Sequence, residues 1–241
     1  MVSQEPTISS HRVTAVIPAA GSGMRMGLKE AKQYLEIGGK PLLSYTLRTF
    51  QECHLVDSII VVVPEKDVDY CIHQMVPRYQ LSKVYKVIGG GERRQDSVRN
   101  GIEAVADSCK WVLIHDGVRP FVSIELIEKV IKAARRYRAV ITGLPVTETI
   151  KRVGSKANVL KTIERNDLWL IQTPQIFSRE DIHLAHQEAL KRGWTEATDD
   201  AFLLEKMGIS AKIIEGEERN IKITTTHDLQ VARFLLSTES R

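Results

Sequence analysis

The sequence predicts an α/β protein built on a doubly wound, mostly parallel sheet. Short apolar runs rich in β-branched residues alternate with longer segments of helical period. The runs are almost continuously apolar, as in residues 59–63, which is typical of strands buried on both faces. Their alternation with helices implies right-handed crossovers between parallel strands. Because ligands bind at the carboxyl ends of the strands in such sheets, we expect the chemistry in the loops that follow strands.

The predicted elements alternate along the chain. Strands are expected at residues 13–19, 58–64, 84–88, 111–115, 139–145 and 211–214. Helices are expected at residues 42–53, 67–79, 95–106, 123–137, 178–192, 199–207 and 226–236, where apolar residues recur with helical spacing.

One segment, about residues 147–173, breaks this alternation. Short alternating pieces at 149–153 and 159–163 flank a turn-like stretch at 154–158, which predicts a β-hairpin. Because a two-stranded hairpin is marginally stable alone, we expect this β-arm to pack against a second subunit. The rest is interpreted as a flexible tail at residues 1–12 and a single domain at residues 13–241 that carries the arm.

Composition narrows the class of protein. The chain has 241 residues, of which 43% are hydrophobic and 27% charged, so a disordered or fibrous protein is excluded. A formal net charge of +4 does not indicate a nucleic-acid-binding protein. The sequence offers no apolar run long enough for a membrane span and no signal peptide, and its three cysteines lack the C-x-x-C spacing of a metal or redox site. We therefore expect a cytoplasmic protein with free thiols and no membrane or nucleic-acid partner.

The first predicted strand leads into a glycine-rich loop at residues 18–27. Small residues let a backbone approach a ligand closely, and successive amides can bind an anion. The spacing matches neither G-x-x-x-x-G-K-[ST] nor G-x-G-x-x-G, which disfavours a dehydrogenase. Arg25 within the loop and Lys32 just beyond it point instead to the binding and stabilisation of polyphosphate charge.

Two further loops follow strands. Residues 89–91 are three glycines that lead into a helix, where Ser97 could contact a base or cap the helix. Asp116 stands at the tip of the fourth strand, in a position suited to Mg²⁺ on a triphosphate. Arg119 could contact a ligand or pair with that acid, and His115 is interpreted as a packed strand residue rather than a general base.

Two other polar groups are interpreted as structural. His183 and His186 share a helix face, but no third residue is spaced to complete a metal site with them. Asp199 and Asp200 precede an apolar run, where acids favour the start of a helix.

Taken together, these motifs resemble the 2-C-methyl-D-erythritol 4-phosphate cytidylyltransferase family, nucleotidyltransferases of the non-mevalonate isoprenoid pathway. The resemblance covers about residues 13–236. The matching segments are P-A-A-G-S-G-M-R-M-G at 18–27, K-Q-Y at 32–34, G-G-x-x-R-x-x-S-V at 90–98, H-D-G-V-R-P at 115–120, E-T-I-K at 148–151, R-N-D-L-W at 165–169, Q-T-P-Q-x-F at 172–177, T-D-D-A at 198–201, and E-G with N-I-K-I-T-T within 215–225.

The resemblance implies a Rossmann-like fold of the nucleotide-diphospho-sugar transferase type and a homodimer joined through the β-arm. It implies that CTP and 2-C-methyl-D-erythritol 4-phosphate react to give 4-diphosphocytidyl-2-C-methyl-D-erythritol and pyrophosphate, with Mg²⁺ or another divalent cation. Arg25 and Lys32 would stabilise the transition state, and Arg165 and Lys222 would position the alcohol phosphate. Asp116 would serve the metal and the sugar. Substrate binding would involve Ala19, Ala20, Gly21, Ser22, Gly23, Gly91, Ser97, Asp116, Gly117, Arg119, Thr149 and Thr173.

The residue chemistry agrees with this reaction. A phosphate monoester is already an anion at neutral pH and needs no general base to attack CTP. The barrier lies in bringing negative charges together, which positioned cations and amides lower.

The sequence departs from the common family pattern at four places. Ala31 stands where the family often has Pro, Gly117-Val118 replaces Ala-Ala, Glu148 replaces Asp, and a Pro is missing near His227. None of these departures removes a charged catalytic position.

Two alternatives remain open. One is a cytidylyltransferase for ribitol 5-phosphate or another alcohol phosphate, and the other is a non-catalytic nucleotide-binding subunit, which the intact charged positions disfavour.

Overall fold

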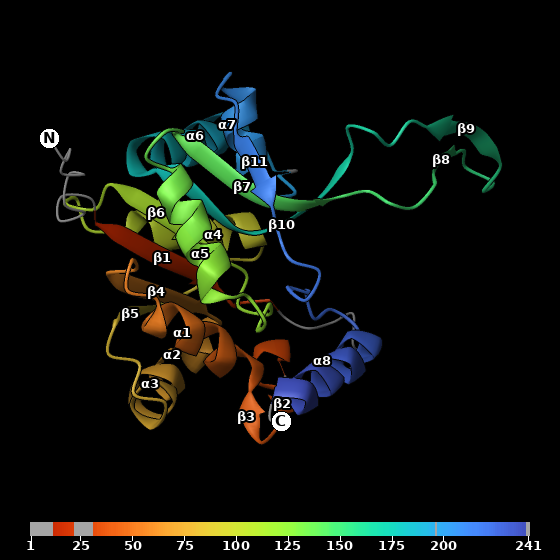
Figure 1. Cartoon of the computed structure of the whole chain (residues 1–241). Coiled ribbons are helices and arrows are strands. Elements are labelled where there is room, and N and C mark those ends of the chain that lie inside the picture. The colour runs from red at the N-terminus through yellow and green to blue at the C-terminus, as the bar shows by residue number, and fades with distance from the viewer. Residues whose placement is uncertain (1–11, 22–30, 196, 240–241) are drawn as a thin grey trace, which may run out of the picture.

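The structure is a computed structural model that describes residues 12–21, 31–195 and 197–239. Its centre is a seven-stranded sheet in the order β11-β7-β10-β6-β1-β4-β5, which confirms the predicted α/β class (Figure 1). All neighbouring strands run parallel except β10, which is antiparallel to β6 and β7. The strands are β1 (Val13–Pro18), β4 (Ser58–Val63), β5 (Val84–Gly89), β6 (Trp111–Ile114), β7 (Ala139–Pro145), β10 (Trp169–Ser178) and β11 (Lys212–Glu215).

Strand β10 is the strand of the central sheet that the sequence did not predict. Pro174 lies in its middle, and a proline within an apolar run argues against a central strand because it cannot donate to the ladder. In the structure, the register between β10 and β7 shifts between Gln172 and Ile176, and the proline lies in this irregular part. Such irregularities often re-aim side chains beside a site.

Alternate residues of each strand enter two separate cores. In β4, Ile59, Val61 and Val63 face one core, whereas Ile60 and Val62 face the other. This burial on both faces explains why the strands read as continuous apolar runs.

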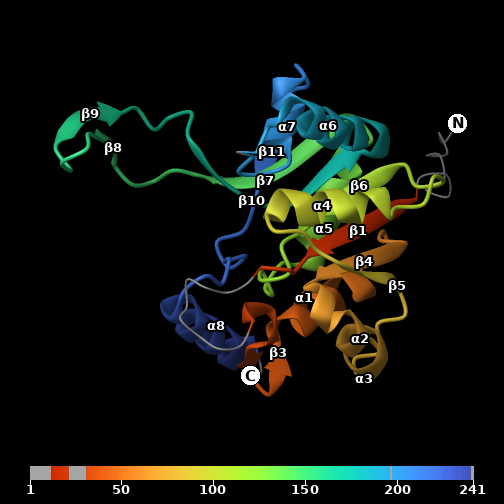
Figure 2. The same ribbon diagram turned by 180° about the vertical axis from the view of Figure 1, so that it is seen from behind.

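Helices cover both faces of the sheet (Figures 1 and 2). The first core is closed by α1 (Leu42–Glu52), α5 (Ile124–Ala133) and the segment that the sequence predicted as one helix at 67–79. The second is closed by α4 (Arg94–Glu103), α6 (Arg179–Arg192) and α7 (Ala201–Lys206).

The segment predicted at 67–79 is not one regular helix. It consists of a 3-10 turn (Glu65–Asp67), α2 (Val68–Tyr70), a π-helical turn (Cys71–Met75) and α3 (Val76–Arg78). Pro77 has no N–H to donate four residues back, which interrupts the regular ladder at this place.

A third, smaller core lies at the C-terminal part of the chain. There α8 (Thr226–Glu239) packs against the short hairpin of β2 (Glu36–Ile37) and β3 (Lys40–Pro41). Ile37 and Ile223 are buried in this core. Apolar contacts of Ile223 therefore hold the stretch that carries the adjacent Lys222 in place.

The β-arm is present as the antiparallel pair β8 (Ile150–Val153) and β9 (Val159–Ile163), and it projects away from the sheet in both views (Figures 1 and 2). Val153, Val159 and Leu160 on it are exposed. The predicted tail, apart from Arg12, lies outside the described residues. Among the described helices, none combines the length and apolar character that crossing a membrane requires.

Candidate active site

Two neighbouring pockets open at the carboxyl ends of β1 and β6. The smaller, of about 180 Å³, is lined by the glycine-rich loops, and the larger, of about 380 Å³, lies between β10 and α7. Arg94, Asp116 and Lys222 line both pockets. The two pockets therefore meet at one charged group of residues.

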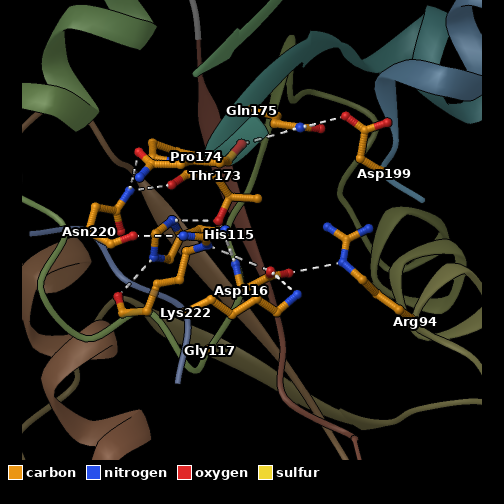
Figure 3. A network of polar contacts seen from close by, with 12 residues as sticks. Arg94, His115, Asp116, Gly117, Thr173, Pro174, Gln175, Asp199, Asn220 and Lys222 are labelled. Atoms are coloured by element: carbon orange, nitrogen blue, oxygen red, sulfur yellow. Dashed lines mark hydrogen bonds and ion pairs between the residues drawn. The ribbon is translucent and has the colours of Figure 1, made fainter. Parts of the chain in front are cut away.

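Asp116 lies at the centre of that group, where Arg94 and Lys222 point toward its carboxylate (Figure 3) and Arg119 lies near it. Its Oδ1 accepts from Arg94 Nε at 2.9 Å, and its Oδ2 lies 2.7 Å from Lys222 Nζ and 3.8 Å from Arg119 Nε. Burial alone would raise the pKa of Asp116, but Arg94, Lys222 and Arg119 outweigh it and hold that pKa well below its ordinary value. Asp116 is therefore an anion at any physiological pH.

Burial and the neighbouring carboxylates shift the pKa values of Arg94 and Arg119 in opposite directions. Burial lowers the pKa of Arg94, but the Asp200 and Asp116 carboxylates more than compensate and raise it. Burial lowers the pKa of Arg119, which Asp116 only partly offsets. Arginine stays protonated despite such shifts, so the site presents fixed positive charge.

A chain of hydrogen bonds fixes the backbone on either side of Asp116 (Figure 3). The Asp116 N–H donates to Thr173 Oγ1 at 3.1 Å, and Thr173 Oγ1 lies 3.1 Å from His115 Nδ1. His115 Nε2 lies 3.1 Å from the carbonyl oxygen of Arg119, which can only accept. His115 Nε2 therefore carries the proton, and Nδ1 accepts from Thr173.

His115 is fully buried, and burial lowers its pKa to about 4, so the ring is neutral. With both nitrogens engaged it cannot serve as a general base, in agreement with the sequence-based interpretation.

The glycine-rich loop after β5 is held by Ser97. The Gly91 N–H donates to Ser97 Oγ at 3.1 Å, and a Cβ on Gly90 would come within 2.3 Å of the Cβ of Ala20. Only glycine permits this close approach of the two loops. Ser97 does not cap α4; the N–H of Arg93, the N-cap residue, is instead bonded by Asp96.

Lys222 is presented by a segment that is fastened to β10. Asn220 is fully buried and donates to the Thr173 carbonyl at 2.7 Å, while its own carbonyl accepts from Arg119 Nη1 at 2.7 Å. The Ile223 N–H donates to the Val118 carbonyl. These bonds set the position of both Lys222 and Arg119.

The structure gathers most of the predicted site residues around the two pockets. The smaller is lined by Ala19, Ala20, Gly21, Lys32, Gly91, Ser97, Asp116 and Lys222, and the larger by Asp116, Arg119, Thr173 and Lys222.

The other predicted residues lie elsewhere. Gly117 lines neither pocket; its N–H and carbonyl bond Pro18 and Thr46, and a Cβ there would crowd Ala19. Thr149 and Arg165 are exposed on the arm, where Arg165 donates to the Thr147 carbonyl. Ser22, Gly23 and Arg25 lie outside the described residues.

The sequence analysis did not include Arg94 among the site residues, and it interpreted Asp200, the partner of Arg94, only as the start of a helix. Arg94 is the arginine of the G-G-x-x-R motif, yet adjacent Arg93 is indistinguishable from it by type. In the structure, Arg93 turns outward to Asp96, and Arg94 bridges Asp116 and Asp200. Asp200 does begin α7 as predicted, but it is also part of the ion-pair network of the site.

The side chains around the two pockets limit how Mg²⁺ could be held. Among the described residues, no three His, Cys, Asp or Glu side chains cluster as a metal site. Asp116 is the buried carboxylate that lines both pockets. One carboxylate together with substrate phosphates is a set that Mg²⁺ accepts, so the residues fit a metal held mainly by a nucleotide. They do not fit a metal held by protein alone.

Comparison with known proteins decides the family. The family model for 2-C-methyl-D-erythritol 4-phosphate cytidylyltransferase matches residues 13–238. The chain belongs to this family. It is therefore a nucleotidyltransferase, as the resemblance implied.

Individual relatives agree with this assignment. The chain is 45% identical over 224 residues to the cytidylyltransferase of Caldanaerobacter subterraneus subsp. tengcongensis, covering 93% of this chain and 98% of that one. It is 42% identical to that of Alkaliphilus metalliredigens, covering 94% and 93%. The crystal structure of the 4-diphosphocytidyl-2C-methyl-D-erythritol synthase from Anaerococcus prevotii has a TM-score of 0.83 at 34% identity, covering 95% and 98%.

The neutral, buried His115 predicts a dependence of stability on pH. Its pKa is about 4 in the folded protein against 6.5 unfolded, so between these values only the unfolded chain binds the proton. Stability should therefore fall as the pH falls from 7 to 5, by about 2 kcal/mol through this group. Urea denaturation at both pH values should show that His115→Gln loses less stability than the wild type over this range. Equal losses in the two proteins would contradict a neutral His115.

Proposed function

We propose that this chain joins CTP and 2-C-methyl-D-erythritol 4-phosphate to form 4-diphosphocytidyl-2-C-methyl-D-erythritol and pyrophosphate. The observation that carries the proposal is the convergence of Lys32, Arg94, Arg119 and Lys222 on two pockets that share Asp116 beside the glycine-rich loops. The names of the relatives identify this pair of substrates, and the geometry is suited to two phosphorylated molecules side by side.

We assign CTP to the smaller pocket. Its glycine-rich walls allow the backbone to approach a base and phosphates, and Gly91 and Ser97 lie where the resemblance expects contacts to cytosine and ribose. The alcohol phosphate then takes the larger pocket, where Arg119, Lys222 and Thr173 offer a cationic and hydroxyl-bearing lining. Asp116 lies between them and can accept from a sugar hydroxyl.

The reaction then needs positioning and charge stabilisation. A phosphate oxygen of the alcohol phosphate forms a bond to the α-phosphorus of CTP. The bond from that phosphorus to the bridging oxygen of the β-phosphate breaks, and pyrophosphate leaves with the electron pair. Lys32, and Arg25 by resemblance, stabilise the charge that develops at the α-phosphate. Arg119 and Lys222 hold the attacking phosphate against its electrostatic repulsion from CTP.

A divalent cation such as Mg²⁺ would supply further charge neutralisation on the triphosphate when it is bound. Asp116 is the residue that would hold it. Arg94 and Lys222 each contact one carboxylate oxygen, and a cation would use the remaining lone pairs of these oxygens.

The arm completes the site from a second subunit in this proposal. Thr149 and Arg165 line neither pocket of their own chain, and the arm carries exposed Val153, Val159 and Leu160. Burying these side chains against another copy of the chain would offset the marginal stability of a two-stranded hairpin. We therefore place Arg165 in the site of the partner chain, where it binds the alcohol phosphate.

Substrate-dependent pyrophosphate release tests the reaction. The purified protein should release pyrophosphate from CTP with 2-C-methyl-D-erythritol 4-phosphate much faster than with ribitol 5-phosphate. Lys32→Ala, which loses a transition-state donor, should lower kcat by about 10²-fold with little change in the KM for CTP. A preference for ribitol 5-phosphate would support the alternative substrate, and absence of release with either would overturn the proposed activity.

Subunit mixing tests the shared site. Arg25→Ala and Arg165→Ala proteins are each expected to be inactive, but a mixed dimer regains one site with both arginines. Random pairing predicts recovery of about a quarter of wild-type activity. Arg25→Ala mixed with Lys32→Ala provides the control, because both residues belong to one chain's loop region and no site is restored. If the first mixture forms mixed dimers and stays inactive, Arg165 serves its own chain.

A further inference from the structure

Arg94 is held by a second carboxylate on the side away from Asp116. Its Nη1 donates to Asp200 Oδ2 at 2.8 Å, while its Nε donates to Asp116 Oδ1 at 2.9 Å. Figure 3 shows Arg94 reaching from α4 toward Asp116. The two bonds use different nitrogens, so the guanidinium is a bridge between two anions rather than a partner of one.

Asp200 cannot itself touch a substrate. It is 1% exposed and lines neither pocket. Any effect of Asp200 on the reaction must therefore pass through the residues that it binds.

The position of Asp200 is itself fixed. Its Oδ1 lies 3.2 Å from Nε2 of the buried His186 on α6, and it is the N-cap residue of α7. The adjacent Asp199 accepts from Gln175 Nε2 at 2.9 Å and from the Phe202 N–H at 3.1 Å. The second carboxylate thus belongs to the packed layer of α6 and α7, whereas the first belongs to the sheet.

Charge explains why such a second anchor matters. Arg94, Arg119 and Lys222 all face the single Asp116 carboxylate, an excess of positive charge at the place where phosphates are to bind. An arginine held by one carboxylate alone would gain by moving onto a bound triphosphate. Such a move would strengthen ground-state binding and release Asp116 from its fixed orientation.

We propose that Asp200 is a positioning residue for the transfer reaction: it holds Arg94 at the junction of the two pockets, so that Asp116 stays oriented while both substrates bind. This inference rests on the proposed function, because its effect is read in the transfer between CTP and the alcohol phosphate. Asp200 contributes to the reaction through geometry and not through contact with either substrate.

Kinetics of Asp200→Asn test the proposal. The amide keeps the size of the side chain but loses the charge that holds Arg94. With CTP and 2-C-methyl-D-erythritol 4-phosphate, kcat should fall by about 10- to 100-fold while the KM for CTP decreases, because a released Arg94 binds the triphosphate in the ground state. The expected split between kcat and KM distinguishes misplacement of Arg94 from a general loss of folded enzyme, which would lower the apparent kcat and leave both KM values unchanged.

Asp181→Asn is the matched control. Asp181 is 3% exposed and pairs with Arg138, but it lines neither pocket. This variant should keep both KM values and kcat near those of the wild type. Thermal unfolding of both variants then shows how much stability each loses.

A double-mutant cycle tests the route through Arg94. In an Arg94→Met background, Asp200→Asn should add less than about a 2-fold further loss of kcat, because its effect requires the guanidinium.

Arg94→Lys, which keeps the charge but cannot bridge two carboxylates in the same way, should reproduce the split between kcat and KM even if Asp200→Asn does not fold. The proposal would be overturned if folded Asp200→Asn had the kcat of the wild type. It would also be overturned if the loss of kcat in the double variant equalled the product of the losses in the two single variants. Inactivity of the wild type itself would instead overturn the proposed function.

Discussion

The pairing of one buried carboxylate with three cations is the constraint on which the site depends. Asp116 accepts from Arg94 and Lys222 and lies near Arg119, and it is 5% exposed. Without an anion at the centre of the group, three positively charged side chains would repel one another at this partly buried place. With it, they are held close enough to one another to receive two phosphorylated substrates.

The fold supplies the members of this group from three segments of the chain. Asp116 follows β6, Arg94 begins α4, Arg119 follows Asp116, and Lys222 lies in the stretch before α8. Strand β10 ties them together, since Thr173 bonds the Asp116 backbone and Asn220 bonds the Thr173 carbonyl. The irregular part of β10 therefore lies where the sheet, the C-terminal stretch and the site meet.

Much of this arrangement could be predicted, and the missing parts have physical reasons. Alternation of apolar runs and helices gave the sheet, and glycines, cations and one acid after strands marked the site. Residue type could not separate Arg93 from Arg94, and although the G-G-x-x-R spacing marks Arg94, only the direction of each side chain at the start of α4 shows which one reaches Asp116. It missed β10 because Pro174 argues against a central strand, and it assigned Asp200 to a helix start because the ion pair with Arg94 spans more than 100 residues.

The free energy of unfolding of Asp116→Asn tests the central claim most directly. If the carboxylate holds three cations together, its removal leaves the buried Arg119 and the partly buried Arg94 and Lys222 repelling one another. The substrate-free variant should then lose about 3 kcal/mol or more relative to the wild type at pH 7, measured by urea denaturation. A variant as stable as the wild type, or more stable, would contradict the account.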